Sequence, residues 1–172
     1  MYLQATKKAL RALGLNPAVL GPPSDTIAPL GDWIVNVVPV GRREAYLFMN
    51  TRTLLSFPIL IGNIRPEVKD MSSFLSHGLK LMAEWLALPA EFDKVIIDCA
   101  NEIALCVNED KSISAVLQAI AADYDFRIER LGGCTSNQLN AVISAVNSTP
   151  RAKIGYRTSR EATLVLLHAR AA

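Results

Sequence analysis

The sequence predicts an α+β fold: an antiparallel sheet with helices packed on one face, followed by a C-terminal α/β extension. The first observation is a succession of short β-rich runs separated by turn residues between Leu30 and Leu60. The second is helical spacing of apolar residues over 66–88 and again over 112–120. The third is size, because 172 residues that are 51% hydrophobic suffice for one compact core. Strands that come before helices in this way are typical of the α+β class.

Three strands are expected in succession, over residues 33–38, 45–49 and 53–61. The polar run Gly41–Glu44 separates the first two and is typical of a hairpin turn. One face of the first strand is wholly apolar and the other mostly so. Because proline has no N–H for a ladder, Pro39 and Pro58 place their strands at an edge or close to their ends.

The N-terminal segment predicts a short strand and a capped helix. Tyr2–Ala5 suits a strand, and Thr6 suits the N-cap of a helix that ends at Gly14. Residues 16–29 contain four prolines and are expected to be irregular.

The later elements follow from the same signals. Asp70 or Ser72 is expected to cap the long helix of 66–88, and Asp110 or Ser112 the helix that follows the polar turn at 108–111. We expect helices over 90–101 and 136–146, a strand over 103–107 and a further strand over 126–131. Residues 154–156 and 162–168 are expected to form a final hairpin, although 164–167 also fits a helix.

Gly132-Gly133 is the best internal boundary, and it predicts a domain over 1–130 and an extension over 131–172 packed on it. The extension holds five basic residues and one acidic residue, whereas the whole chain has a net charge of +2. A weakly basic segment is consistent with an anionic partner or with an ordinary solvated surface.

The cellular location is expected to be the cytoplasm. No apolar run approaches the ~20 residues that span a bilayer, and the N-terminus lacks the pattern of a signal peptide. The three cysteines, Cys99, Cys106 and Cys134, lie in apolar surroundings, as expected of free thiols in a reducing compartment.

No assembled catalytic or cofactor motif is present, so we expect no cofactor, no metal site and no membrane partner. His77 and His168 are isolated, and the cysteines lack the paired spacing of zinc ligands. The sequence contains no nucleophile elbow and no phosphate-binding loop. The acidic pairs Asp123/Asp125 and Glu109/Asp110 are expected to be solvated charges and caps.

Three segments, in this order, resemble an uncharacterised family of small bacterial domains of unknown function. They are Thr6–Gly14, the LGDW motif with the following strands through Phe57, and Asn108–Ser112 with the helix after it. The third segment departs from the family pattern, because Lys111 stands where members have arginine and Gln118 where they have asparagine. The resemblance covers roughly residues 1–130, implies occurrence on chromosomes and mobile elements, and brings no established activity.

Three functions remain open. The first is a non-enzymatic protein-interaction or regulatory module, with an unknown protein or a second copy as partner; by analogy it would act on a mobile element or inhibit a defence system. Its candidate surface consists of Asp32, Trp33, Arg42 and Arg43. The second is nucleic-acid binding, for which the candidate contacts are Arg151, Lys153, Tyr156, Arg157 and Arg160. The third is a small enzyme whose site would be assembled from Asp32, Arg43, Asn50 and His77.

Overall fold

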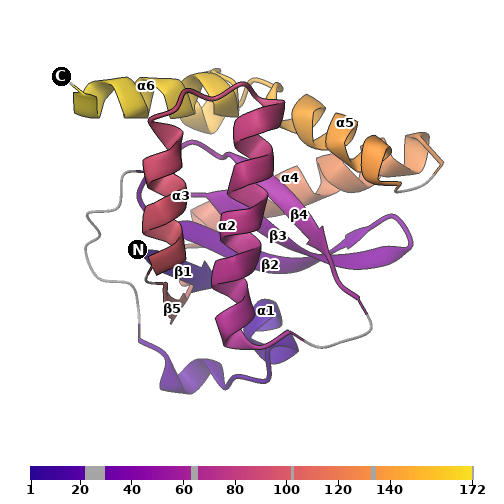
Figure 1. Cartoon of the computed structure of the whole chain (residues 1–172). Helices are drawn as coiled ribbons and strands as arrows, with labels where there is room; N and C mark the ends of the chain where they lie inside the picture. Colours follow the sequence, from indigo (N-terminus) through magenta and orange to yellow (C-terminus); the bar gives the residue numbers. More distant parts are fainter. Residues whose placement is uncertain (22–29, 63–65, 102, 133–134, 172) are drawn as a thin grey trace.

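A computed structural model describes residues 1–21, 30–62, 66–101, 103–132 and 135–171 (Figure 1). The prolines of 22–29, Cys134 and the thiol of Cys99 lie outside this description. The strands are β1 (Tyr2–Ala5), β2 (Trp33–Val40), β3 (Arg43–Asn50), β4 (Ser56–Leu60) and β5 (Ala104–Val107). The helices are α1 (Lys7–Ala12), α2 (Val68–Trp85), α3 (Phe92–Asn101), α4 (Lys111–Arg130), α5 (Ser136–Asn147) and α6 (Ser159–Ala171), with 3₁₀ turns η1 (Pro17–Val19) and η2 (Ala152–Ile154).

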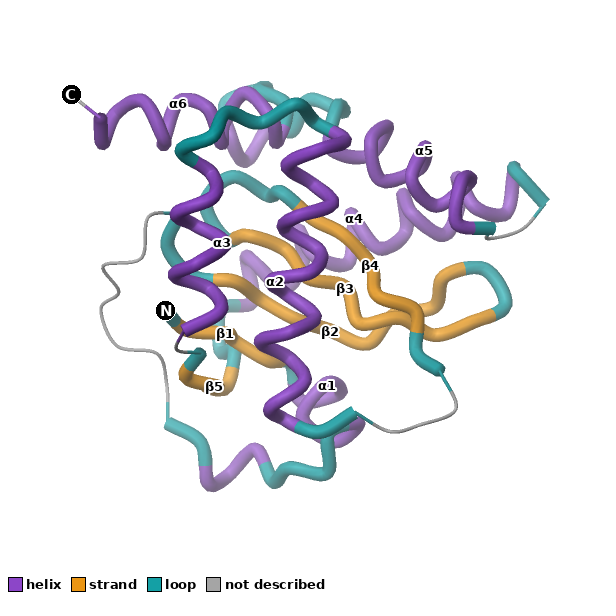
Figure 2. Tube along the Cα trace, in the orientation of Figure 1, coloured by secondary structure: helices purple, strands orange, loops and turns teal. Residues whose placement is uncertain are grey.

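The strands form one sheet in the order β4-β3-β2-β1-β5 (Figure 2). β2, β3 and β4 are antiparallel, as the sequence predicted, and Pro58 lies on an edge strand. The expectation of a wholly antiparallel sheet is wrong, however, because β1 pairs parallel with both β2 and β5. The physical reason is that connections containing helices produce parallel neighbours: α1 lies between β1 and β2 in the chain, and α2 and α3 lie between β4 and β5.

Helices cover both faces of the sheet, which corrects the expectation of one covered face. On one side, the ring of Phe57 lies against Gly78 of α2, and α3 lies beside α2 (Figure 1). On the other side, Tyr124 of α4 bonds to Ser56, and Thr6 at the start of α1 bonds to Asn36 of β2. β2 is accordingly buried at every position except Pro39, as expected for a strand that is covered on both faces.

The C-terminal half is α-helical, which corrects two predictions. The strand expected over 126–131 is not formed, because α4 continues to Arg130 and keeps Tyr124 and Ile128 on its buried face. The final hairpin is not formed either. Thr158 and Glu161 exchange the two hydrogen bonds of a capping box at the start of α6 instead. The α+β class is confirmed, but the described part of the extension contains helices and one isolated bridge, Arg151 to Arg157, rather than strands.

Candidate functional site

The four residues of the predicted interaction surface do not form one surface. Trp33 is 0% exposed, and its indole N–H has no partner among the described residues. Asp32 precedes β2 and accepts hydrogen bonds from the Tyr2 N–H at 3.0 Å and from the Gln4 side chain. Arg42 and Arg43 lie past the other end of β2, and the two ends of this strand are roughly 23 Å apart at about 3.3 Å per residue. They line a groove of about 580 Å³ between the β2–β3 turn and the end of α4.

The predicted nucleic-acid contacts are divided between internal and exposed roles. Arg151 forms an ion pair with Asp123 at 2.6 Å, and the Arg160 Nε donates to the Leu86 carbonyl at 2.6 Å. Both side chains therefore hold the C-terminal segment on the domain. The remaining contacts, Lys153, Tyr156 and Arg157, are exposed.

Of the residues proposed for a small enzyme, the structure brings Asp32 and Asn50 together, since the Asn50 amide donates to the Asp32 carbonyl at 3.3 Å, but it does not bring Arg43 to them. Arg43 begins β3 and Asn50 ends it, so these two lie at opposite ends of one strand. The Asn50 side chain is buried and organises the following turn, accepting from the Thr53 N–H and donating to the Leu30 carbonyl. His77 is exposed on α2. Within the described ranges, no group of three or more His, Cys, Asp or Glu is arranged to hold a metal ion.

Three of the four acidic residues predicted to be solvated charges and caps serve as caps and braces, and the fourth, Glu109, is exposed. Asp110 caps α4 by accepting from the N–H groups of Ser112 and Ile113. Asp123 holds Arg151 through one carboxylate oxygen and Arg127 through the other. Asp125 accepts from the Gly41 N–H at 2.9 Å and so fixes the β2–β3 turn against α4.

A buried polar cluster joins α4, α5 and the edge strand β4, and sequence reasoning did not find it. The Asn147 amide accepts from the Ser56 N–H at 2.9 Å and donates to the Ser56 carbonyl at 2.8 Å, in the way that a neighbouring strand would. The Tyr124 hydroxyl also donates to that carbonyl at 2.8 Å, and burial raises its pKa far above the ordinary value. The cluster is fully bonded, so its role is to close the β4 edge and to fix α5 beside it.

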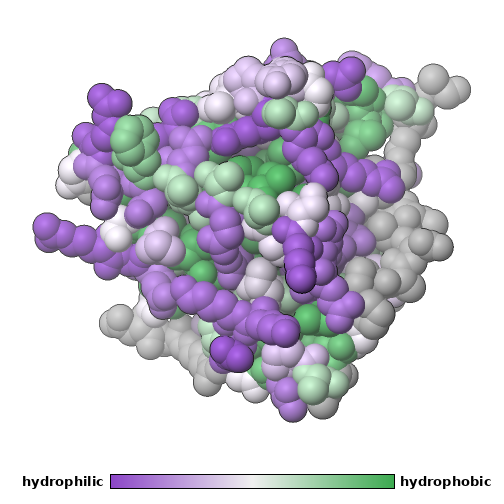
Figure 3. Space-filling model, turned by 180° about the vertical axis from the view of Figure 1, so that it is seen from behind, coloured by the Kyte–Doolittle hydropathy of each residue, from purple (hydrophilic) through white to green (hydrophobic). Residues whose placement is uncertain are grey.

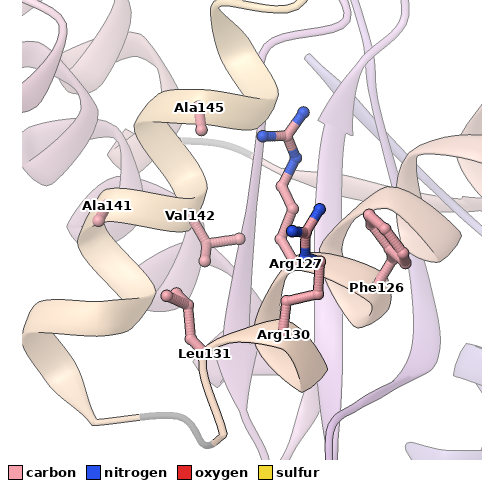
Figure 4. A pocket seen from close by; sticks show the side chains of 7 residues that line it. All are labelled: Phe126, Arg127, Arg130, Leu131, Ala141, Val142 and Ala145. Atoms are coloured by element: carbon pink, nitrogen blue, oxygen red, sulfur yellow. The ribbon is translucent and has the colours of Figure 1, made fainter.

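An apolar groove remains open between α4 and α5 (Figure 4). Its volume is about 410 Å³, and its lining is Phe126, Arg127, Arg130, Leu131, Ala141, Val142 and Ala145. Phe126 is 57% exposed and Leu131 is 47% exposed, although both are large apolar residues. Leu131 and Val142 point toward each other across the gap between the two helices. The buried cluster at Asn147 thus holds α5 where its small residues and the end of α4 form two sides of a groove.

Positive charge lies at the rim of this groove. The Arg130 guanidinium is 5.6 Å from the centre of the Phe126 ring, which is the geometry of a cation–π contact. Arg127 is held by Asp123 and also donates to the Thr149 hydroxyl. The groove therefore offers an apolar floor with an arginine beside an exposed aromatic ring. Such a combination suits an apolar side chain next to a carboxylate.

The sequence profile of a domain of unknown function, DUF6933, matches residues 2–162. The chain belongs to the DUF6933 family. The match runs through β1 to the start of α6, so it includes the α4–α5 groove and most of the basic C-terminal segment. No curated protein sequence matches this DUF6933 chain. None of its helices, over the residues described, combines the length and hydrophobicity needed to cross a membrane.

Proposed function

We propose that the protein is a non-enzymatic interaction module that binds a partner protein in the α4–α5 groove. The observation that carries the proposal is the exposure of Phe126 and Leu131, two large apolar residues that line an apolar groove. Large apolar residues that cluster at the surface are typical of binding sites, and aromatic and arginine side chains are the usual anchors of protein interfaces.

The chemistry of the groove supports a particular kind of partner. Its floor accepts an apolar side chain, and Arg130 at the rim is placed to bind a carboxylate beside that side chain. We expect a short segment with an apolar residue next to Asp, Glu or a C-terminal carboxylate. We further propose that this module acts in bacterial regulation connected with mobile elements, a role that the family resemblance suggests.

The test is co-purification of partners from the native host, with one variant that fills the groove. Ala141 is exposed in the groove wall, so Ala141→Trp occupies the space without disturbing the core. A matched control is Lys94→Trp on the exposed face of α3, on the opposite side of the sheet. We expect Ala141→Trp to lose a stoichiometric protein that wild type and the control retain. Equal recovery of every protein by all three would exclude the groove.

Nucleic-acid binding is a second candidate, and the turn at Tyr156 favours it. Tyr156 is 77% exposed and has a left-handed backbone with φ of 60°, which is uncommon for a residue with a side chain. Its N–H donates to the Arg151 carbonyl at 2.9 Å, so the turn is fixed. An aromatic ring held out between Lys153 and Arg157 can stack on a base while the cations contact phosphate.

This second candidate predicts that Tyr156→Ala and Lys153→Gln/Arg157→Gln each weaken binding to single-stranded DNA or RNA. The double variant should also reduce the dependence of affinity on salt, because two phosphate contacts are lost. Fluorescence anisotropy with labelled oligonucleotides measures both effects, and Lys94→Gln is the control. Wild type that does not bind at 50 mM salt would exclude the candidate.

A further inference from the structure

The outer edge of β4 presents main-chain groups that β3 does not use. The Asn50 N–H donates to the Leu55 carbonyl at 2.8 Å, so the main-chain groups of Leu55 point towards β3. Successive residues of an antiparallel strand point these groups alternately towards the neighbouring strand and away from it. The main-chain groups of Ser56, Pro58 and Leu60 therefore point away from β3.

Only the first of these three positions is closed by the described part of the chain. Asn147 bonds to both the N–H and the carbonyl of Ser56. The Pro58 carbonyl and both main-chain groups of Leu60 form no hydrogen bond among the described residues. Proline has no N–H, so position 58 offers an acceptor, whereas position 60 offers a donor and an acceptor. We call these three groups the open β4 edge.

An apolar groove of about 440 Å³ lies along the open β4 edge, and we call it the β4 groove. Leu81 and Trp85 line it from α2, and Leu139 and Ile143 line it from α5. Figure 1 shows β4 and α5 diverging from each other. On the side of α4, by contrast, Figure 3 shows hydrophobic surface broken up among hydrophilic side chains. The β4 groove thus combines apolar walls with unpaired main-chain groups, as sites for extended peptides do.

We propose that an extended segment of a partner protein binds in the β4 groove and adds to the sheet beside β4. Main-chain donors and acceptors spaced two residues apart match the main chain of another strand, so the occupant is an extended peptide. In antiparallel orientation, one partner residue exchanges two hydrogen bonds with Leu60, and the residue two positions along donates to the Pro58 carbonyl. These bonds continue the row that Asn147 begins at Ser56.

The walls of the β4 groove determine which side chains the segment carries. Phe57 packs against Gly78 of α2, so the side chains of residues 57 and 59 point towards α2. Those of residues 56, 58 and 60 point the other way, as the contact between Ser56 and Tyr124 shows. Because cross-strand neighbours point to the same face, the middle residue of the segment meets the α2 wall and the two beside it meet the α5 wall. We therefore expect three successive apolar residues, of which the outer two are not proline because each donates its N–H.

This proposal goes beyond the α4–α5 groove and does not rest on it. Leu139 and Ile143 line the β4 groove, whereas Ala141 and Val142 line the α4–α5 groove. The two sites lie on different sides of α5, so either proposal can fail while the other holds.

The probe is a phage-displayed library of short random peptides, selected on the full wild-type chain. Synthetic copies of the selected peptides are then bound to the wild type and to Leu60→Pro. This substitution removes the outward N–H and no bond to β3, and an edge strand tolerates proline there, as it does at Pro58. We expect Leu60→Pro to weaken binding by about tenfold, because a main-chain hydrogen bond is lost.

Leu105→Pro is the matched control, because it makes the same change on β5, at the opposite edge of the sheet. The Ala104 N–H donates to the Met1 carbonyl at 3.1 Å, so the main-chain groups of Leu105 point away from β1. We expect this control to bind the selected peptides with wild-type affinity. Unfolding in urea checks that both variants keep the native fold.

Amide hydrogen exchange, measured by NMR, tests the wild type without any substitution. In the free chain, the Leu60 amide should exchange faster than the Ile59 amide, which bonds to β3. A bound peptide should slow exchange of the Leu60 amide by about tenfold and leave that of Ile59 unchanged.

A library that yields no binding peptide would overturn the proposal, as would a bound peptide that leaves exchange of the Leu60 amide unchanged. Peptides that lose affinity on Ala141→Trp but not on Leu60→Pro occupy the α4–α5 groove, so they would exclude the β4 edge while supporting the proposed function. Protection of the Leu60 amide that increases with protein concentration alone would assign the edge to a second copy and exclude the partner segment.

Discussion

The buried cluster at the β4 edge leads to a quantitative prediction for Asn147→Ala. The substitution removes both bonds that the amide makes to the Ser56 backbone. Ser56 is 0% exposed, so its N–H is left without a partner and without water, which costs about 1–3 kcal/mol. The missing amide group also leaves a small cavity. We expect the free energy of unfolding to fall by about 3 kcal/mol. The variant should still fold, because the total stability of a domain is typically about 5–15 kcal/mol.

Tyr124→Phe is the matched comparison, because it removes a bond to the same peptide unit. The Ser56 carbonyl still accepts from Asn147 after the hydroxyl is lost, and the ring still fills its space. We therefore expect a loss of about 1 kcal/mol. Urea unfolding monitored by circular dichroism at pH 7 measures the stability of both variants. An unchanged slope of the unfolding free energy against urea concentration is the check on two-state behaviour. A loss for Asn147→Ala that is no larger than that for Tyr124→Phe would refute the reasoning.

Three other predictions follow from single sites. Gly78→Ala should destabilise the protein by about 2 kcal/mol despite the better helix propensity of alanine, because the new Cβ would lie 2.0 Å from the Phe57 ring. Urea unfolding should show a smaller loss of stability when the same substitution is made in a Phe57→Leu variant. An equal loss in that variant would contradict the clash. Burial, and then the Asp32 charge, raise the pKa of the Cys106 thiol from 9.0 to about 11. The unfolded thiol thus ionises first, stability falls as pH rises from about 9 towards 11, and Cys106→Ala should remove part of that fall in unfolding curves at pH 8 and 10.5. The Thr158 N–H and hydroxyl lower the pKa of the Glu161 carboxyl, so NMR titration should give a pKa below the ordinary 4.5. The stabilisation that this carboxylate gives to the start of α6 is then present above pH 4.5 and is lost as the pH falls through the lowered pKa. A pKa at or above 4.5 would contradict the capping box.

Features that depend on neighbouring residues were predictable from the sequence. Thr6 caps α1 as predicted, and Asp110, one of the two predicted residues, caps α4, because a cap needs only its own side chain and the next three N–H groups. The cap predicted for the long helix is wrong, because α2 starts earlier, with Glu67 as its N-cap and Asp70 in its first turn. The three antiparallel strands were also correctly placed, since alternation and turn residues are local signals. The strand predicted at 126–131 is not formed, because Tyr124 and Ile128 continue the buried face of α4 beyond residue 120.

Whether both faces of a sheet are covered is not a local property. The nearly uninterrupted apolar run of β2 is the one signal in the sequence that indicates two covered faces. The parallel pairing of β1 with β5 joins segments about a hundred residues apart, and no spacing in the sequence states which strands become neighbours.

The sequence by itself determined the α+β class, the family resemblance, most helices and strands, and the absence of recognisable catalytic motifs. Only the tertiary structure decided which polar residues are internal braces and which surface is open. Asn147 and Ser56 are 91 positions apart, and Trp33 is hidden while Phe126 is exposed. The physical reason is that exposure and hydrogen bonding depend on which distant segments pack together, and the packing energy of the whole domain sets that arrangement.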